Sequence, residues 1–360
     1  MDNQSKPSTE PSTSISLKDN GFVDSATGQA MLPSLMSPEQ EQQFQIRQNK
    51  FVGDNSLRDS IRHIQSYDIA DQYLPMYLKL SDEEIYYLRF IARFRSVQKL
   101  QLLREATLFP EIFDGSRLTK DLRHLVVSGL IWRWSYRHPV INSNIDVFTL
   151  SGNGYRFLET IYGQEYHFHP QNFYRLPGVF HVRFWETVDI YQLLVSLPAY
   201  RGSSNVFSGG KGELMHSIVT SPLQVALALK QEDVRNFVFY PALQHDGDSF
   251  FQKVVVKWDQ FTNHGEKLNQ SVNSLPGRQN VLAFYTASIK QATDLTEKLE
   301  LGQFNFPIVF LVGSIIKKYG VTKAFLAPIR NPEPGKPTLQ PLELDNIVEE
   351  GESTHAEDEA

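Results

Sequence analysis

The chain has 360 residues, 41 % of them hydrophobic, no cysteine and a formal net charge of −6. This length allows two packed domains with tails, and the lack of cysteine excludes disulfides and thiolate metal sites. No window approaches the roughly 18 apolar residues of a membrane-spanning helix. Residues 1–21 hold no apolar core, which argues against a secretory signal. The sequence therefore favours a cytoplasmic protein with no membrane partner.

The negative charge is concentrated at one end of the chain. Residues 343–360 hold eight Asp or Glu and no Lys or Arg, and residues 1–342 carry a net charge of +2. From 115 to 140 there are five Lys or Arg and one Asp. Because the distribution of charge matters more than its sum, the acidic total does not exclude a nucleic-acid partner.

Both ends are predicted to be disordered. Residues 1–55 are rich in Ser, Thr, Pro, Gln and Asn, and such a segment buries too little apolar area to offset its chain entropy. Residues 56–80 form a lead-in to the first periodic segment. The acidic tail, 331–360, opens on "NPEPGKPTLQP" and carries the same expectation.

Residues 81–163 predict three helices, a hairpin and a closing helix. "SDEEIYYLRFIARFR" begins with a capping box formed by Ser81 and Glu84. Ser96 is the expected cap of a second helix, "SVQKLQLLREAT". The third helix places four apolar side chains on one face and ends before Gly129; these are Leu118, Leu122, Leu125 and Val126.

A two-stranded hairpin is expected after the third helix. Its strands are "LIWRWSYR" and "VFTL", joined by "HPVINSNID", and the helix "SGNGYRFLETIYG" follows. Three helices followed by a two-stranded wing is the order of a winged helix-turn-helix domain. Trp132 and Trp134 alternate with Arg133, so both are expected to face one side and to pack there rather than stack on bases.

The region 178–330, after a linker over 164–177, has a different pattern. The runs "NFVFY", "SFFQKVVVKW", "VLAFYTA", "FPIVFLVG" and "VTKAFLA" predict strands, while "SPLQVALALKQEDV" and "SIKQATDLTEKLE" predict helices. The fold class is therefore α+β: a winged helix-turn-helix domain followed by an α/β domain with a mixed sheet.

The solvent-facing side of the third helix is the candidate site. In a winged helix this helix enters the major groove and the wing meets the neighbouring backbone or minor groove. Lysine and arginine neutralise phosphates, and arginine can read guanine edges. The candidate DNA contacts on the helix and the wing are Arg117, Lys120, Arg123, His124, Arg133, Arg137, Asn142 and Asn144.

Three stretches together resemble the replication-relaxation family of plasmid proteins. They are "SRLTKDLRHLVVSGLIWRW", "VFTLSGNGYRFL" and the helix start "FHVRFWETVDIYQLL", and the resemblance spans about 81–298. It implies a role in plasmid replication or conjugative mobilisation, either as an accessory DNA-binding protein or as a relaxase that nicks the transfer origin. It also implies that the second domain resembles a restriction-endonuclease fold with an acidic pair near a proline-aspartate-alanine motif.

The acidic pair of that family is incomplete in this chain. Pro241 and Ala242 are adjacent with no Asp between them, and the expected acidic strand offers Gln252 and Lys253. A metal-dependent nuclease needs hard oxygen ligands for its cation. The candidates nearby are Asp246, Asp248 and Asp259, with Lys253 or Lys257 as a cationic partner. "HDGDS", which holds the first two, favours a turn over a ligand pair.

Other motifs favour ordinary structure over chemistry. "SGGKGE" at 208–213 lacks the spacing of a phosphate loop, and "YHFHP", with His167 and His169, lacks the further ligands that zinc needs. No catalytic residue, metal ligand or cofactor is therefore predicted.

The main prediction is sequence-directed binding of double-stranded DNA by a cytoplasmic plasmid replication or mobilisation protein. Two alternatives remain: a metal-dependent DNA-nicking enzyme, and a protein–protein docking module that uses a winged helix. In the docking module, the acidic tail would bind a basic partner or shield the protein's own basic face. Other replication or transfer proteins and a second copy of the chain are further candidate partners.

Overall fold

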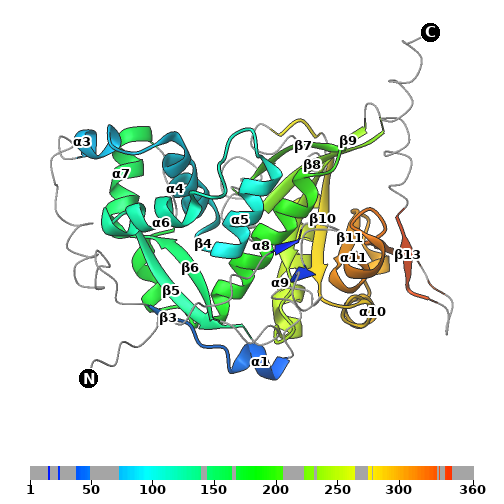
Figure 1. Cartoon of the computed structure of the whole chain (residues 1–360). Coiled ribbons are helices and arrows are strands. Elements are labelled where there is room, and N and C mark those ends of the chain that lie inside the picture. Colours follow the sequence, from blue (N-terminus) through cyan, green and yellow to red (C-terminus); the bar gives the residue numbers. More distant parts are fainter. Residues whose placement is uncertain are drawn as a thin grey trace, which may run out of the picture.

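The structure, a computed structural model, is an α+β fold with a four-stranded and a seven-stranded sheet (Figure 1). A two-residue ladder, β1 (Ile15–Ser16) with β2 (Val23–Asp24), lies outside both sheets. The structure describes residues 15–16, 23–24, 38–48, 73–138, 144–163, 168–205, 223–230, 233–263, 275–277, 279–330, 332 and 337–342.

Residues 81–163 follow the predicted order with one added strand, β4, and helix α3 precedes them. The elements of this first half of the fold are α3 (Tyr73–Tyr77), α4 (Asp82–Phe94), β4 (Ser96–Gln98), α5 (Lys99–Leu108), α6 (Leu118–Val127), β5 (Ile131–Arg137), β6 (Asn144–Leu150) and α7 (Gly152–Tyr162). β5 and β6 form the predicted hairpin, and β4 pairs antiparallel with β6. The sheet order is β3-β5-β6-β4, in which β3 is Arg47–Gln48.

The predicted helix boundaries of α4 and α6 are confirmed. Ser81 and Glu84 form the capping box at the start of α4. The four predicted apolar residues of α6 are all buried. Gly129, with φ 71°, takes the left-handed backbone that ends the helix.

The predicted role of Ser96 is wrong. Ser96 lies in strand β4 opposite Thr149 of β6, and α5 begins later, with Gln98 as its N-cap residue. The Ser96 hydroxyl instead contacts His181 Nδ1 at 2.7 Å and accepts a hydrogen bond from Trp185 Nε1 at 3.0 Å. A buried hydroxyl must find a partner, and here helix α8 (Val179–Val195) supplies two.

The second half is built on a mixed seven-stranded sheet, as predicted. Its order is β13-β12-β11-β10-β9-β8-β7, in which β9, β10 and β11 run parallel and the outer pairs run antiparallel. The elements are α8 (Val179–Val195), β7 (Tyr200–Ser204), β8 (Leu223–Lys230), β9 (Asp233–Pro241), α9 (Asp248–Asn263), β10 (Gln279–Thr286), α10 (Ile289–Lys298), β11 (Ile308–Val312), α11 (Gly313–Tyr319), β12 (Phe325–Pro328) and β13 (Leu339–Pro341). Two short 3₁₀ helices, η3 (Pro170–Tyr174) and η6 (Leu301–Gln303), complete the set.

Two elements of this half were predicted with the wrong type. "SFFQKVVVKW" forms helix α9, because its buried residues recur at helical spacing: Phe251, Val254, Val255 and Trp258. "SPLQVALALKQEDV" contains strand β8, whose residues from Leu223 to Ala228 are all buried. A strand covered on both faces lacks the alternation that marks a half-exposed strand, and its Ala and Leu content favoured a helix.

The predicted disorder of the two ends does not hold for the β1–β2 ladder, nor for two further segments that join the sheets. Residues 38–48 contain helix α1 (Pro38–Gln42) and strand β3 (Arg47–Gln48), which pairs with β5. β13 pairs with β12 at the edge of the large sheet. Both segments contribute backbone hydrogen bonds to an existing sheet, an interaction that local composition does not indicate.

Helix α8 lies at the centre of the molecule (Figure 1). It packs against β4, α4 and α5 on one side and against β7, β8 and β9 on the other. Thirteen of its residues are buried, and one hydrophobic cluster contains side chains from both halves of the fold, from Tyr73 to Leu326. The residues of the predicted linker that the structure describes also pack: Phe173 lies between Phe168 and His181.

Candidate nucleic-acid interface

The outer face of α6 carries the predicted cations in exposed positions. Lys120 and Arg123 are exposed, and Val127, the last residue of α6, is 50 % exposed. Arg117 is the N-cap residue, and its guanidinium lies 4.0 Å from the buried Asp121 carboxylate, with about half of the side chain in solvent. The amphipathic spacing that buries Leu122 on the inner side turns these charges outward.

His124 belongs to the same face but has a partner. Its Nδ1 lies 2.6 Å from Oε1 of Glu84, a buried residue of α4. The His124 side chain is 43 % exposed, whereas that of Glu84 is 7 % exposed. The imidazole therefore sits at the border between α4 and the solvent-facing side of α6.

The hairpin presents its remaining predicted residues on the side of α6. On β5, Ile131 packs into the hydrophobic cluster that contains the buried face of α6. Arg133 and Arg137 are on the same side of the strand as Ile131, because alternate residues share a face. Asn144 pairs with Arg137 across the hairpin and is exposed. Arg133 Nε lies 3.9 Å from Asp146. Asn142 lies outside the described residues.

The opposite face of the hairpin is aromatic and buried. Trp132, Trp134 and Tyr136 are at most 6 % exposed, and the Tyr136 ring stacks on Trp185 of α8 at 4.6 Å. Trp134 Nε1 donates a hydrogen bond to Thr149. This confirms the prediction that the two tryptophans pack together on one side. Burial lowers the pKa of the neighbouring His181 to about 3.

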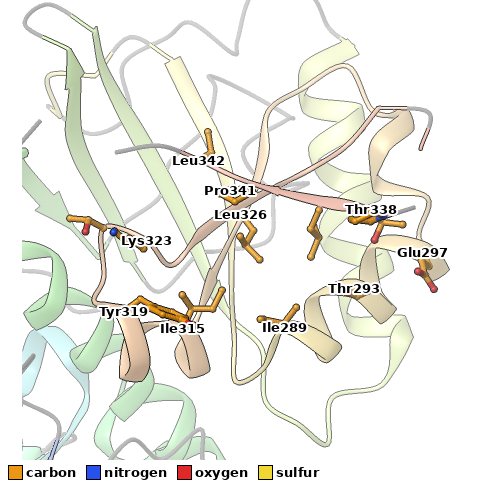
Figure 2. Close-up of a pocket in the computed structure, with 13 residues that line it drawn as sticks. Ile289, Thr293, Glu297, Ile315, Tyr319, Lys323, Leu326, Thr338, Pro341 and Leu342 are labelled. Atoms are coloured by element: carbon orange, nitrogen blue, oxygen red, sulfur yellow. The ribbon is translucent and has the colours of Figure 1, made fainter. Parts of the chain in front are cut away.

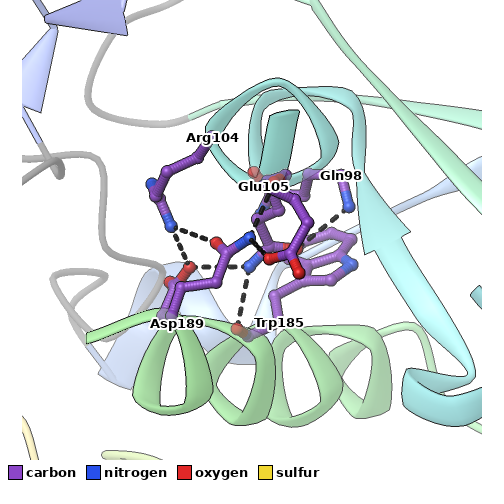
Figure 3. Close-up of polar contacts among 7 residues, drawn as sticks. Gln98, Arg104, Glu105, Trp185 and Asp189 are labelled. Atoms are coloured by element: carbon purple, nitrogen blue, oxygen red, sulfur yellow. Dashed lines mark hydrogen bonds and ion pairs between the residues drawn. The ribbon is translucent and has the colours of Figure 1, made fainter. Parts of the chain in front are cut away.

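A buried polar network joins α5 to α8 (Figure 3). Arg104 forms an ion pair with Asp189 at 2.9 Å and donates to Gln192. Gln101 donates to Asp189 and to the Trp185 carbonyl, and Gln192 donates to Glu105. Burial raises the pKa of Asp189, and Arg104 opposes that shift.

Sequence reasoning missed this network. A signal is present in the helical spacing of its members, with 101, 104 and 105 on α5 facing 185, 189 and 192 on α8. Polar residues at such spacing ordinarily form a solvated face. Only the packing of α8 onto α5 shows that these side chains bind one another.

Two of the three carboxylates considered for a nuclease site, Asp246 and Asp248, are engaged by separate cations. Asp246 accepts from Arg183 of α8 at 2.6 Å, and Asp248 accepts from Lys298 of α10 at 3.2 Å. The expected acidic strand is helix α9, so Gln252 and Lys253 do not occupy a strand position. Within the described part of the chain, no group of three His, Asp or Glu side chains is placed to hold a metal ion.

Two buried glutamates, Glu186 and Glu41, lie near Asp246. Glu186 of α8 is buried, and neither carboxyl oxygen has a hydrogen-bond partner among the described residues. Glu41 of α1, also buried, accepts from the backbone N–H of His245 and contacts its Nδ1 at 2.7 Å. Burial raises the pKa of Glu186 well above its ordinary value, and the nearby Glu41 adds to the shift.

A separate groove of about 900 Å³ lies between α10, α11 and the strands β12 and β13 (Figure 2). Its lining is mainly apolar, with Ile289 and Tyr319 about half-exposed at its sides. The elements that line it, among them α10, α11 and β13, are on the opposite side of the molecule from α6 (Figure 1). It is therefore not part of the basic surface.

The remaining motifs add no site. "SGGKGE" and His167 lie outside the described residues, and the His169 ring packs against Tyr155 at 4.9 Å. Among the described helices, none combines the length and the apolar composition needed to cross a bilayer.

The comparisons with protein-family models, with curated proteins and with solved structures gave no match. The assignment to the replication-relaxation family therefore remains a prediction.

Proposed function

We propose that residues 81–163 form a winged helix that binds double-stranded DNA through α6 and the hairpin β5–β6. The observation that carries the proposal is the shared orientation of the cations. Lys120 and Arg123 on α6 and Arg137 with Asn144 on the hairpin are all exposed, and the two hairpin residues lie on the strand face opposite the buried tryptophans.

The element order supports the same proposal. In α4–β4–α5–α6–β5–β6 the short strand β4 pairs with the second hairpin strand, so the hairpin extends as a wing beside the third helix. Winged helices place the third helix in the major groove and the wing on the neighbouring backbone. Arginine and lysine in those positions neutralise phosphates and release counterions.

The biological setting that we propose is plasmid replication or conjugative mobilisation in the cytoplasm, with an accessory or regulatory role. It rests on the sequence resemblance. Other replication or transfer proteins, or a second copy of the chain, would be the protein partners. Because Asp246 and Asp248 are each paired with a cation of another helix, the geometry favours DNA binding over metal-dependent nicking.

The test is a gel shift of the full chain with duplex DNA over a series of salt concentrations. We expect affinity to fall steeply with salt, and the double variant Lys120→Ala, Arg123→Ala to weaken binding and flatten the salt slope by about two units. Lys317→Ala, Lys318→Ala is the matched control, because both lysines are exposed on α11 away from α6.

Equal losses in the two double variants would mean that binding is diffuse and not centred on α6. Absence of binding even at low salt would overturn the proposal. A protein-docking role for the same surface would then be the better explanation of its exposed cations.

A further inference from the structure

We propose that His124 is a specificity-determining residue, which accepts a hydrogen bond from an exocyclic amino group of adenine or cytosine in the major groove, and that Glu84 sets this preference as a positioning residue. This inference rests on the proposed DNA-binding function. It concerns the bases that α6 reads, which the distribution of positive charge does not determine.

The carboxylate of Glu84 decides which imidazole nitrogen carries the proton. An ionised carboxylate only accepts hydrogen bonds, so a neutral imidazole whose Nδ1 lies 2.6 Å from Oε1 of Glu84 must carry its hydrogen on Nδ1. The other nitrogen, Nε2, is then an acceptor. Since Nδ1 faces a buried group, the exposed part of the ring is the edge that carries Nε2.

Glu84 is itself held in place from the other side. Its second oxygen, Oε2, accepts the backbone N–H of Ser81 at 2.8 Å, while the Ser81 hydroxyl accepts the backbone N–H of Glu84 at 3.2 Å. This capping box and the burial of the carboxylate restrict the side chain to one orientation. The imidazole that it contacts is restricted with it.

The acceptor sets His124 apart from its neighbours on α6. Lys120 and Arg123 can only donate hydrogen bonds, which suits phosphate oxygens and the N7 and O6 acceptors of guanine. In the major groove, the donors are the N6 amino group of adenine and the N4 amino group of cytosine. An outward Nε2 acceptor next to these cations therefore selects adenine or cytosine at one position.

The variant Glu84→Gln is expected to exchange the donor and acceptor roles of the two imidazole nitrogens of His124, with little change in the shape of residue 84. The capping box still needs an acceptor for the Ser81 N–H, so the amide oxygen takes that role and the amide NH₂ group turns to His124. Nδ1 must then accept, and the hydrogen moves to Nε2. The outward atom becomes a donor, which suits guanine N7 or O6, thymine O4 or adenine N7 and disfavours cytosine at the same position.

The experiment is selection of bound duplexes from a randomised pool by the full chain, at mildly alkaline pH. We expect the wild-type protein to select adenine or cytosine at one position, and Glu84→Gln to disfavour cytosine and to accept guanine or thymine there. The change in relative affinity should be about 2- to 10-fold, the range of one net hydrogen bond. Thermal unfolding of Glu84→Gln checks that its fold is retained.

Two variants sharpen the result. Glu83→Gln makes the same charge change one residue earlier on α4 and should keep the wild-type preference. His124→Leu should remove the preference at that position while salt-dependent binding persists. If the wild-type protein binds duplexes but no position responds to Glu84→Gln or His124→Leu, this inference is wrong and the proposed function stands. If the wild-type protein binds no duplex, both are wrong.

Discussion

Helices α6 and α8 both carry charged side chains, but they use them in opposite ways. On α6, Lys120 and Arg123 point into solvent and have the apolar stripe behind them. On α8, Asp189 and Glu186 are buried, and Asp189 is bound by Arg104 and Gln101 of the facing helix.

This comparison distinguishes exposed charged side chains, which can bind a partner, from buried charged side chains, which stabilise the folded structure through their own partners. An exposed cation contributes little to folding stability, so it can form an ion pair with a phosphate without weakening the fold. A buried ion pair has lost its hydration, so removal of one member leaves the other uncompensated. The hairpin has a comparable division between a buried and an exposed face. Its aromatic side chains pack against α8, and its arginines lie on the other face of the strand.

The largest expected effect is on α8. Asp189→Ala leaves the Arg104 guanidinium buried without its carboxylate, and we expect a loss of about 3–5 kcal/mol in the free energy of unfolding. Denaturant unfolding measures it. Asp233→Ala, which breaks the half-exposed pair with Arg235, is the control and should cost less than about 1 kcal/mol. Similar losses in both would contradict the distinction between the two kinds of charge.

Glu186 predicts a pH dependence that the α6 charges do not share. Its pKa is raised on folding, so the folded state holds a proton that the unfolded state releases as the pH rises above about 4.5. Stability from this group is therefore complete at low pH and is lost as the pH rises through the folded pKa.

The variant Glu186→Gln tests this sign, because it keeps the shape without the ionisation. Its stability relative to the wild type should increase by about 1.4 kcal/mol for each pH unit between the two pKa values. Denaturant unfolding across a pH series measures the difference. A difference that stays constant with pH would show that Glu186 does not titrate on unfolding.

The smallest expected effect is on the hairpin. Arg137→Ala removes one exposed cation at the end of β5 and should reduce the salt slope of DNA binding by about one unit, with stability within about 0.5 kcal/mol of the wild type. Arg330→Ala, an exposed arginine beyond β12, is the matched control. If the control changes binding as much as Arg137→Ala does, the wing is not part of the interface.

Local sequence determined the elements whose signals are local. The Ser81 and Glu84 capping box, the apolar stripe of α6, Gly129 at its end and the hairpin with its buried tryptophans were all predicted from residues within a few positions of one another. Gly154 is different, because the reason for a glycine inside α7 is tertiary: a side chain there would collide with the carbonyl of Leu130, which precedes β5. The exposed cations of the candidate site follow from the same periodicity.

Tertiary structure decided what depends on residues far apart in the chain. The sequence predicted a helix at β8 and a strand at α9, because burial on both faces of β8 removes the alternation of a half-exposed strand and β-branched residues outweighed the helical spacing in α9. The partners of Arg104, Ser96 and His124 lie 40 or more positions away. A side chain's chemistry limits the partners it can accept, but which partner it meets is set by the packing of α4, α5 and α8, and no local pattern encodes that packing.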